Sequence, residues 1–227
     1  MAATLDALLD AALPHVVFDG WTEATLDQAV CDLGISAAEA KGLAPRGAVD
    51  LAVALHRRGD QAMIDRMAAA DLSQMRYSDR VATALRFRIE AMPDKDAVRR
   101  ATTLFSLPIH AGDGAKLIWE TADHVWTTLG DTSEDGNWYT KRAILSGVWA
   151  ATVLFWLGDE SEDAADTAAF IDRRIANVMS FEKTKAQLRK SSLTKPLMEL
   201  QSSILAKFSA PKATDTSNLP GRWNTND

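Results

Sequence analysis

Residues 119–175, WETADHVWTTLGDTSEDGNWYTKRAILSGVWAATVLFWLGDESEDAADTAAFIDRRI, decide the fold of this chain. Mostly apolar side chains recur every three or four positions in three successive runs, which is the spacing of one buried helix face. The runs are Trp119, Ala122, Trp126 and Leu129; Trp138, Arg142, Leu145, Trp149, Val153 and Trp156; and Phe170, Ile171, Ile175, Val178 and Met179. The sequence therefore predicts helices over 117–129, 138–157 and 164–180.

Five of the seven tryptophans fall in this stretch, and two interpretations of them stay open. Each can be an ordinary core residue, which is the commoner case. Because indoles are seldom buried completely, several on neighbouring helices can also line a wide apolar cavity. The predicted lining residues are Trp119, Trp126, Leu145, Trp149, Phe155 and Phe170.

The N-terminal region has the spacing of three short helices. The first covers 4–13, and Pro14 is expected to end or bend it. Thr22 can cap a second helix over 23–32, which Gly34 breaks. Ser36 and Glu39 have the capping-box spacing that opens a third helix. Three short helices joined by tight turns resemble a helix-turn-helix.

Further helical patterns follow at 48–70, 78–92 and 94–107, and the two glycines of 110–114 predict a loop. After residue 180, the pattern predicts a basic helix over 181–192 and an amphipathic helix over 196–208. Because no segment alternates apolar and polar residues for long, we predict an all-α chain of nine or ten helices. The predicted divisions are a helix-turn-helix-like unit (1–47), a helical body (48–181), a basic segment with the amphipathic helix (182–208) and a disordered tail (209–227).

The charge is unevenly distributed. The net charge is −6, but 182–212 holds seven basic and two acidic residues, so this part is +5 and the remainder −11. A basic segment next to an amphipathic helix favours either docking on the body or binding to an anionic membrane surface. The predicted membrane-contacting residues are Leu197, Met198, Leu200, Ile204, Leu205 and Phe208.

Motifs for enzymatic chemistry are weak. The run from Asp131 to Gly136 imitates a calcium loop, but its twelfth position is the cation Arg142. No phosphate-binding glycine motif or nucleophile triad occurs, and His56 shows no catalytic spacing. The single Cys31 excludes an internal disulfide, and we interpret it as a small apolar filler. We therefore predict no catalysis, no metal and no cofactor.

DNA binding is also disfavoured. The candidate recognition helix, SAAEAKGL, offers Lys41 for phosphates, but Glu39 opposes it and Asp32 adds negative charge. We expect no nucleic-acid partner. A ligand-responsive transcription regulator of the tetracycline-repressor family stays the alternative function.

Three segments resemble the Coq-nine family of ubiquinone-biosynthesis accessory lipid-binding proteins. They are LDAALPHVVFDGWT (9–22), GDTSEDGNWYTKR (130–142) and DTAAFIDRRI (166–175). The resemblance extends over most of 4–180 and is weaker beyond. It implies a tetracycline-repressor-like all-α fold in which the N-terminal unit does not read DNA.

The resemblance also implies a function. The family binds isoprenoid quinone intermediates or other lipids and supports the demethoxyubiquinone di-iron hydroxylase, so the expected role is presentation of lipid to that enzyme at a membrane. Family partner contacts carry over to Asp135, Asn137, Trp138, Tyr139 and Arg142. We expect a cytoplasmic protein peripherally associated with the inner membrane, and a homodimer stays open. Extracting such a lipid needs a comparable apolar cavity, since burial contributes roughly 25 cal/mol per Å².

Overall fold

The computed structural model describes residues 3–92, 94–133 and 136–190. The predicted partner residue Asp135 and the predicted tail over 209–227 lie outside these ranges. So do the predicted membrane-contacting residues, Leu197, Met198, Leu200, Ile204, Leu205 and Phe208. Their assignments stay predictions.

The described residues form nine α-helices and one short 3₁₀ helix, without a strand, so the all-α prediction is confirmed for them. In the described part, none of the helices combines the length and apolar character that crossing a membrane requires. The helices are α1 (Leu5–Asp19), α2 (Glu23–Leu33), α3 (Ala37–Leu43), α4 (Ala48–Ala69), α5 (Tyr77–Glu90), α6 (Lys95–Ser106), α7 (Ala111–Thr128), α8 (Gly136–Leu157), η1 (Glu162–Ala164) and α9 (Ala165–Lys190).

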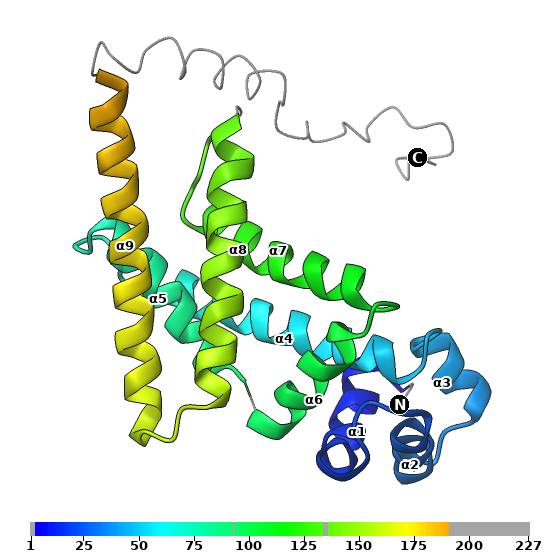
Figure 1. The fold of residues 1–227 in the computed structure, drawn as a ribbon. Helices are drawn as coiled ribbons and strands as arrows, with labels where there is room; N and C mark the ends of the chain where they lie inside the picture. The colour runs from blue at the N-terminus through cyan, green and yellow to red at the C-terminus, as the bar shows by residue number, and fades with distance from the viewer. Residues whose placement is uncertain (1–2, 93, 134–135, 191–227) are drawn as a thin grey trace, which may run out of the picture.

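Two apolar cores share the helix α4. Figure 1 shows α1, α2 and α3 gathered at one end and α8 and α9 side by side at the other, with α4 between them. The first half of α4, through Leu55, packs with α1, α2, α3 and α6. Its second half, from Met63, packs with α5, α7, α8 and α9. The segment between the two halves carries His56, Gly59 and Asp60, so polar groups lie where the cores meet. The division of the chain at residue 47 stays a prediction.

Helix ends in the N-terminal unit follow from local chemistry. The Thr22 hydroxyl accepts a hydrogen bond from the Thr25 backbone N–H and caps α2. Gly34 ends α2 in the left-handed conformation, which glycine adopts without a steric penalty. Ser36 and Glu39 form both bonds of the capping box that begins α3. These three predictions are confirmed.

The prediction that Pro14 ends the first helix is wrong. Helix α1 continues through Pro14 to Asp19. Pro14 is exposed, and Val16 is fully buried on the same stripe as Leu9 and Ala12. Burial of the last turn therefore outweighs the backbone bond that proline removes.

Three further expectations need correction. Residues 111–114 are the first turn of α7 rather than a loop, and a Cβ on Gly114 would lie 2.8 Å from the Phe105 Cβ, so glycine permits the close crossing of α6 and α7. The helices expected over 164–180 and 181–192 are one continuous helix, α9, as far as Lys190. Cys31 is exposed and does not fill a core.

Candidate functional site

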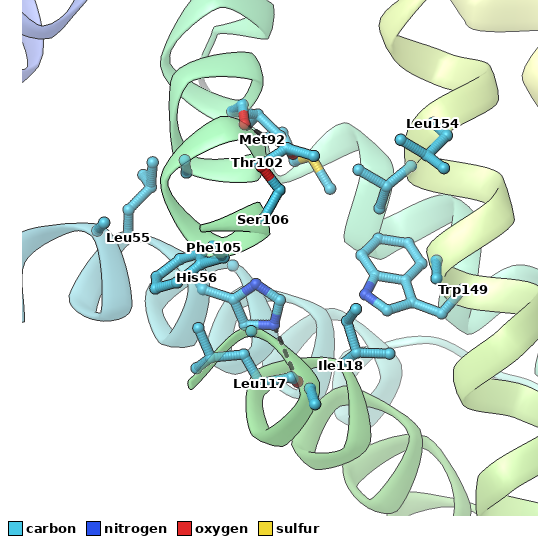
Figure 2. Close-up of a pocket in the computed structure, with 18 of the residues that line it drawn as sticks. Leu55, His56, Met92, Thr102, Phe105, Ser106, Leu117, Ile118, Trp149 and Leu154 are labelled. Atoms are coloured by element: carbon cyan, nitrogen blue, oxygen red, sulfur yellow. Dashed lines mark hydrogen bonds between the residues drawn. The ribbon is translucent and has the colours of Figure 1, made fainter. Parts of the chain in front are cut away.

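A cavity of about 390 Å³ lies where the two cores meet. Its volume falls within the range typical of small-molecule sites, roughly 300–1,000 Å³. Figure 2 shows its walls, which come from α4, α6, α7 and α8. The apolar lining includes Leu55, Met92, Val98, Phe105, Leu117, Ile118, Trp149, Val153 and Leu154. Leu154 is 62% exposed, so the cavity reaches the surface beside it.

Arg88, on α5, and His56 form the polar part of the wall, and Arg88 makes a buried ion pair with Asp60 behind it. The Arg88 Nε donates to Asp60 Oδ1 over 2.6 Å, and both side chains are at most 3% exposed. Arg88 also donates to the His56 carbonyl over 2.8 Å, and Thr121 donates to Asp60 over 2.8 Å. The second oxygen of Asp60 accepts no hydrogen bond from the described residues and lies 3.7 Å from the His56 Nε2. A buried ion pair is costly unless its hydrogen bonds have good geometry. Because these bonds join residues of α4, α5 and α7, a shift of any of the three helices would break them, and the bonds therefore fix the relative positions of these helices.

Gly59 makes room for this pair. A Cβ at position 59 would lie 2.3 Å from the Arg88 Nη1, which is closer than any real contact. The Arg88 guanidinium carbon lies 5.3 Å from the ring centre of Trp149, within cation–π range. Gly59 is therefore the place where a guanidinium crosses α4.

His56 lies beside the ion pair and lines the cavity. Its Nε2 is 3.1 Å from the Leu117 carbonyl and 2.9 Å from the Thr121 hydroxyl. Burial, aided by the positive charge of Arg88, lowers the pKa of His56 to about 4. The imidazole is neutral at pH 7, and because the Leu117 carbonyl can only accept, Nε2 carries the proton. Nδ1 is therefore a hydrogen-bond acceptor.

Of the six predicted lipid-contacting residues, Trp149 alone lines this cavity. Leu145 is buried in the second core. Phe155 and Phe170 stack on each other at 4.4 Å, and Trp126 stacks on Tyr77 at 6.0 Å. Trp119 contacts a separate aromatic group. A helical period identifies the inward face of a helix, and it cannot tell whether the neighbouring helix fills the space.

That separate group, which we call the aromatic knot, consists of Trp119, Trp138 and Tyr139. Trp138 lies 4.7 Å from Tyr139 in an edge-to-face arrangement and 6.0 Å from Trp119. All three side chains are partly exposed. The predicted partner residues Trp138 and Tyr139 are thus close together at the surface, next to the exposed Asn137.

Arg142 supports the knot from inside. It is 2% exposed, and its guanidinium lies 3.9 Å from the Trp138 ring centre. It donates to Asp123 over 2.5 Å and to Asp131 over 3.2 Å. Although burial raises the pKa of Asp131, hydrogen bonds from Lys141, Ser133 and Arg142 outweigh this effect and lower that pKa overall. Arg142, predicted as a partner contact, is covered by the ring that it supports.

The described residues contain no group of three or more His, Cys, Asp or Glu side chains arranged to hold a metal ion. Asp131, the first residue of the imitated calcium loop, is bound by Lys141 and Arg142 instead. Sequence reasoning missed the polar wall residues His56 and Arg88, and also Asp60 and Thr121, which bind them from behind the wall. A signal was present, since Arg88 interrupts the buried stripe of Val81, Leu85 and Ile89 at helical spacing.

Comparison with known proteins gives a consistent result. The COQ9 family profile matches residues 111–182, which cover α7, α8 and much of α9. The ubiquinone biosynthesis protein COQ9, mitochondrial, of Rattus norvegicus is 30% identical over 192 residues, covering 80% of this chain and 61% of the relative. The Homo sapiens protein is 28% identical, covering 80% and 59%. The chain thus spans about three fifths of the length of these curated relatives.

Among solved structures, the chain is similar to the TetR transcriptional regulator from Nitrosomonas europaea ATCC 19718. The TM-score is 0.63 at 21% sequence identity, and the match covers 76% of this chain and 95% of that one. At this identity the likeness shows the fold alone. It confirms the prediction of a tetracycline-repressor-like all-α fold.

Proposed function

We propose that this chain, which is similar to COQ9 proteins over most of its length, is a non-catalytic protein of ubiquinone biosynthesis that binds an isoprenoid quinone intermediate at a membrane and presents it to the demethoxyubiquinone hydroxylase. The observation that carries the proposal is the cavity between α4, α6, α7 and α8. Its wall is mostly apolar and its mouth lies beside exposed Leu154. An apolar guest in such a space gains roughly 25 cal/mol for each Å² that it buries.

The size of the cavity sets how the guest is held. A volume of about 390 Å³ lies near the lower end of the range for ligand sites. It suits an aromatic head with the beginning of a tail, and the rest of a polyprenyl tail passes out beside Leu154. Such a guest is shared between protein and membrane, which agrees with a presenting role.

The aromatic knot is the surface that we assign to the hydroxylase. Exposed aromatic side chains on a rigid support are typical of interface hot spots. Trp138 and Tyr139 are partly exposed, and Arg142 fixes Trp138 from below. Arg142 therefore acts in docking by positioning Trp138 rather than by touching the partner.

The cavity role is tested by extracting purified protein with organic solvent and identifying lipids by mass spectrometry. Ala150→Phe adds bulk to a residue that lines the cavity and should reduce the recovered lipid several-fold. Gly147→Phe places the same side chain on the same helix where nothing lies within 4 Å, and should keep the lipid. If wild-type protein carries no lipid and binds no added quinone precursor, the cavity role is wrong.

The docking role has its own test. The double variant Trp138→Ala with Tyr139→Ala should weaken hydroxylase binding in a pull-down by about ten-fold or more, the size of a hot-spot loss. Phe18→Ala, at the 79% exposed end of α1, is the matched control and should bind normally. Unfolding of the double variant, seen by circular dichroism, would show that these rings are core instead.

Membrane association is tested by deletion. Removing residues 193–227 should reduce binding to vesicles that contain anionic lipid, because it removes the amphipathic pattern and part of the basic segment. Unchanged binding would assign the membrane contact to another part of the chain.

The alternative of a DNA-binding regulator has little support in the chemistry of α2 and α3. The fold is shared with a TetR regulator, but between Thr22 and Pro45 Lys41 is the single basic residue, against Glu23, Asp27, Asp32 and Glu39. Non-specific DNA binding depends on neutralising phosphates with Lys and Arg. A gel-shift assay at low salt should show no complex, and a salt-sensitive complex would favour the regulator.

A further inference from the structure

Two hydrogen-bonding groups in the cavity wall lack partners among the described residues. The first is the indole Nε1–H of Trp149. This residue is fully buried, and its N–H has no acceptor. The Nδ1 of His56 is the second, because the contacts of this ring to described residues are made through Nε2. Buried polar groups are satisfied in most native structures, so the unpaired indole N–H of Trp149 needs an explanation. The His56 side chain is 19% exposed, so its Nδ1 is accessible to a guest rather than sealed in the protein.

These two groups belong to one space. Figure 2 shows Nδ1 of His56 turned away from the bond to Leu117, on the side of the ring nearer Ser106, which also lines the cavity. The Trp149 indole stands across this space, with its nitrogen on the side that faces His56. One wall therefore offers an acceptor and the opposite wall offers a donor.

Neighbouring contacts hold His56 in the acceptor role. The Nε2 of His56 is committed to α7 through Leu117 and Thr121, so the ring cannot turn its proton toward the cavity without losing those bonds. The positive charge of Arg88 disfavours a second proton on the ring. The Thr102 hydroxyl, which also lines the cavity, donates to the Val98 carbonyl and so faces a guest as an acceptor.

We infer that this end of the cavity recognises an uncharged aromatic head group bearing a hydroxyl, which donates to His56 Nδ1 while an oxygen of the same head accepts from Trp149 Nε1–H. This inference rests on the proposed lipid-binding function and adds the chemistry that selects the head. The head enters first and the tail follows toward Leu154.

The test uses three probes with the same tail, 4-nonylphenol, its methyl ether 4-nonylanisole and nonylbenzene. Their affinities for the wild-type chain are measured by isothermal titration calorimetry. The phenol should bind about ten-fold more tightly than the ether, because the ether keeps the oxygen acceptor and loses the donor. This comparison needs no variant. An ether that binds as tightly as the phenol would overturn the inference.

Two variants at one position locate the effect. Gln in His56→Gln can place an N–H where Nε2 lies and keep the bond to Leu117, but it removes the acceptor at the Nδ1 position. The phenol-to-ether preference should fall about ten-fold. Asn in His56→Asn offers an oxygen near the Nδ1 position, and the preference should be kept. If the preference survives in His56→Gln, His56 does not read the hydroxyl.

The outcomes separate the two proposals. If none of the three probes binds, the lipid-binding function fails and the head-group inference fails with it. If all three bind with no preference for the phenol, the lipid-binding function holds and the inference about the head group alone is wrong.

Discussion

The support behind the polar wall of the cavity and the base of the aromatic knot are built in the same way. Each contains a buried arginine bound to aspartate, with its guanidinium against an indole: Arg88 with Asp60 and Trp149, and Arg142 with Asp131 and Trp138. They differ in what the indole meets on its other side. Trp149 borders an empty volume, whereas Trp138 is partly exposed beside two other aromatic rings. The same device thus fixes the wall of an interior site in one case and a surface in the other.

The largest expected effect compares removal of each arginine. Arg88→Met leaves Asp60 buried without a cation and should lower the free energy of unfolding by about 3–5 kcal/mol. Arg142→Met should cost about 1–3 kcal/mol, because Asp131 keeps Lys141 and Asp123 is 39% exposed to water. Urea denaturation measures both. Equal losses would break the comparison.

A double variant sharpens this first prediction. Adding Asp60→Leu to Arg88→Met removes the orphaned charge, and most of the lost stability should return. If the double variant is no more stable than Arg88→Met alone, the loss comes from packing rather than from the uncompensated carboxylate.

The second prediction concerns pH. The pKa of His56 is about 4 in the folded chain and 6.5 when unperturbed, so the unfolded state takes up the proton first as the pH falls. Stability is complete above pH 6.5 and should fall by about 2–4 kcal/mol between pH 6.5 and 4. The Asp131 pKa lies below its ordinary value, so the knot loses stability only at lower pH.

Denaturation of the wild-type chain and of His56→Gln across this pH range checks the prediction. The fall in the free energy of unfolding should appear in the wild type and be absent from His56→Gln, since glutamine does not titrate. Parallel curves would mean that His56 is not the group responsible.

The third prediction concerns two helical glycines. Gly59→Ala forces the Arg88 guanidinium to move and should cost about 1–3 kcal/mol, the range for overpacking. Gly147→Ala, where nothing lies within 4 Å, should stabilise by about 0.5–1 kcal/mol through helix propensity. Thermal unfolding of both variants gives the sign. Stabilisation by Gly59→Ala would show that the guanidinium is loosely held.

The smallest effect belongs to the cavity mouth. Leu154→Ser should change stability by less than about 0.5 kcal/mol, because the side chain is 62% exposed. Its affinity for nonylbenzene, measured by calorimetry, should fall a few-fold through loss of apolar contact. A large loss of stability would place Leu154 in the core rather than at an entrance.

Most of the fold followed from local chemistry in the sequence. Thr22, Gly34 and Ser36 act within a few residues of themselves, so their roles at helix ends are readable without any knowledge of tertiary contacts. Pro14 was misread because the stripe that carries α1 past it depends on burial against other helices. Local signals failed where distant packing decided the outcome.

The site was less predictable. The period of α7 and α8 identifies inward positions, but Trp119 meets Trp138 while Trp149 meets a cavity, and this difference depends on neighbouring helices. The ion pair of Asp60 and Arg88 links residues that are 28 positions apart in the sequence and lie on different helices. A polar residue on an apolar stripe signals such a pair, although it does not name the partner.

The crossing of Arg88 over Gly59 has a consequence for the evolution of related sequences. Alanine at position 59 and arginine at position 88 cannot occupy the same space. As related sequences diverge, the residue at each of these two positions therefore limits which substitutions are tolerated at the other. Homologous chains that gain a side chain at 59 should carry a shorter residue at 88, together with a neutral replacement for the acid at 60.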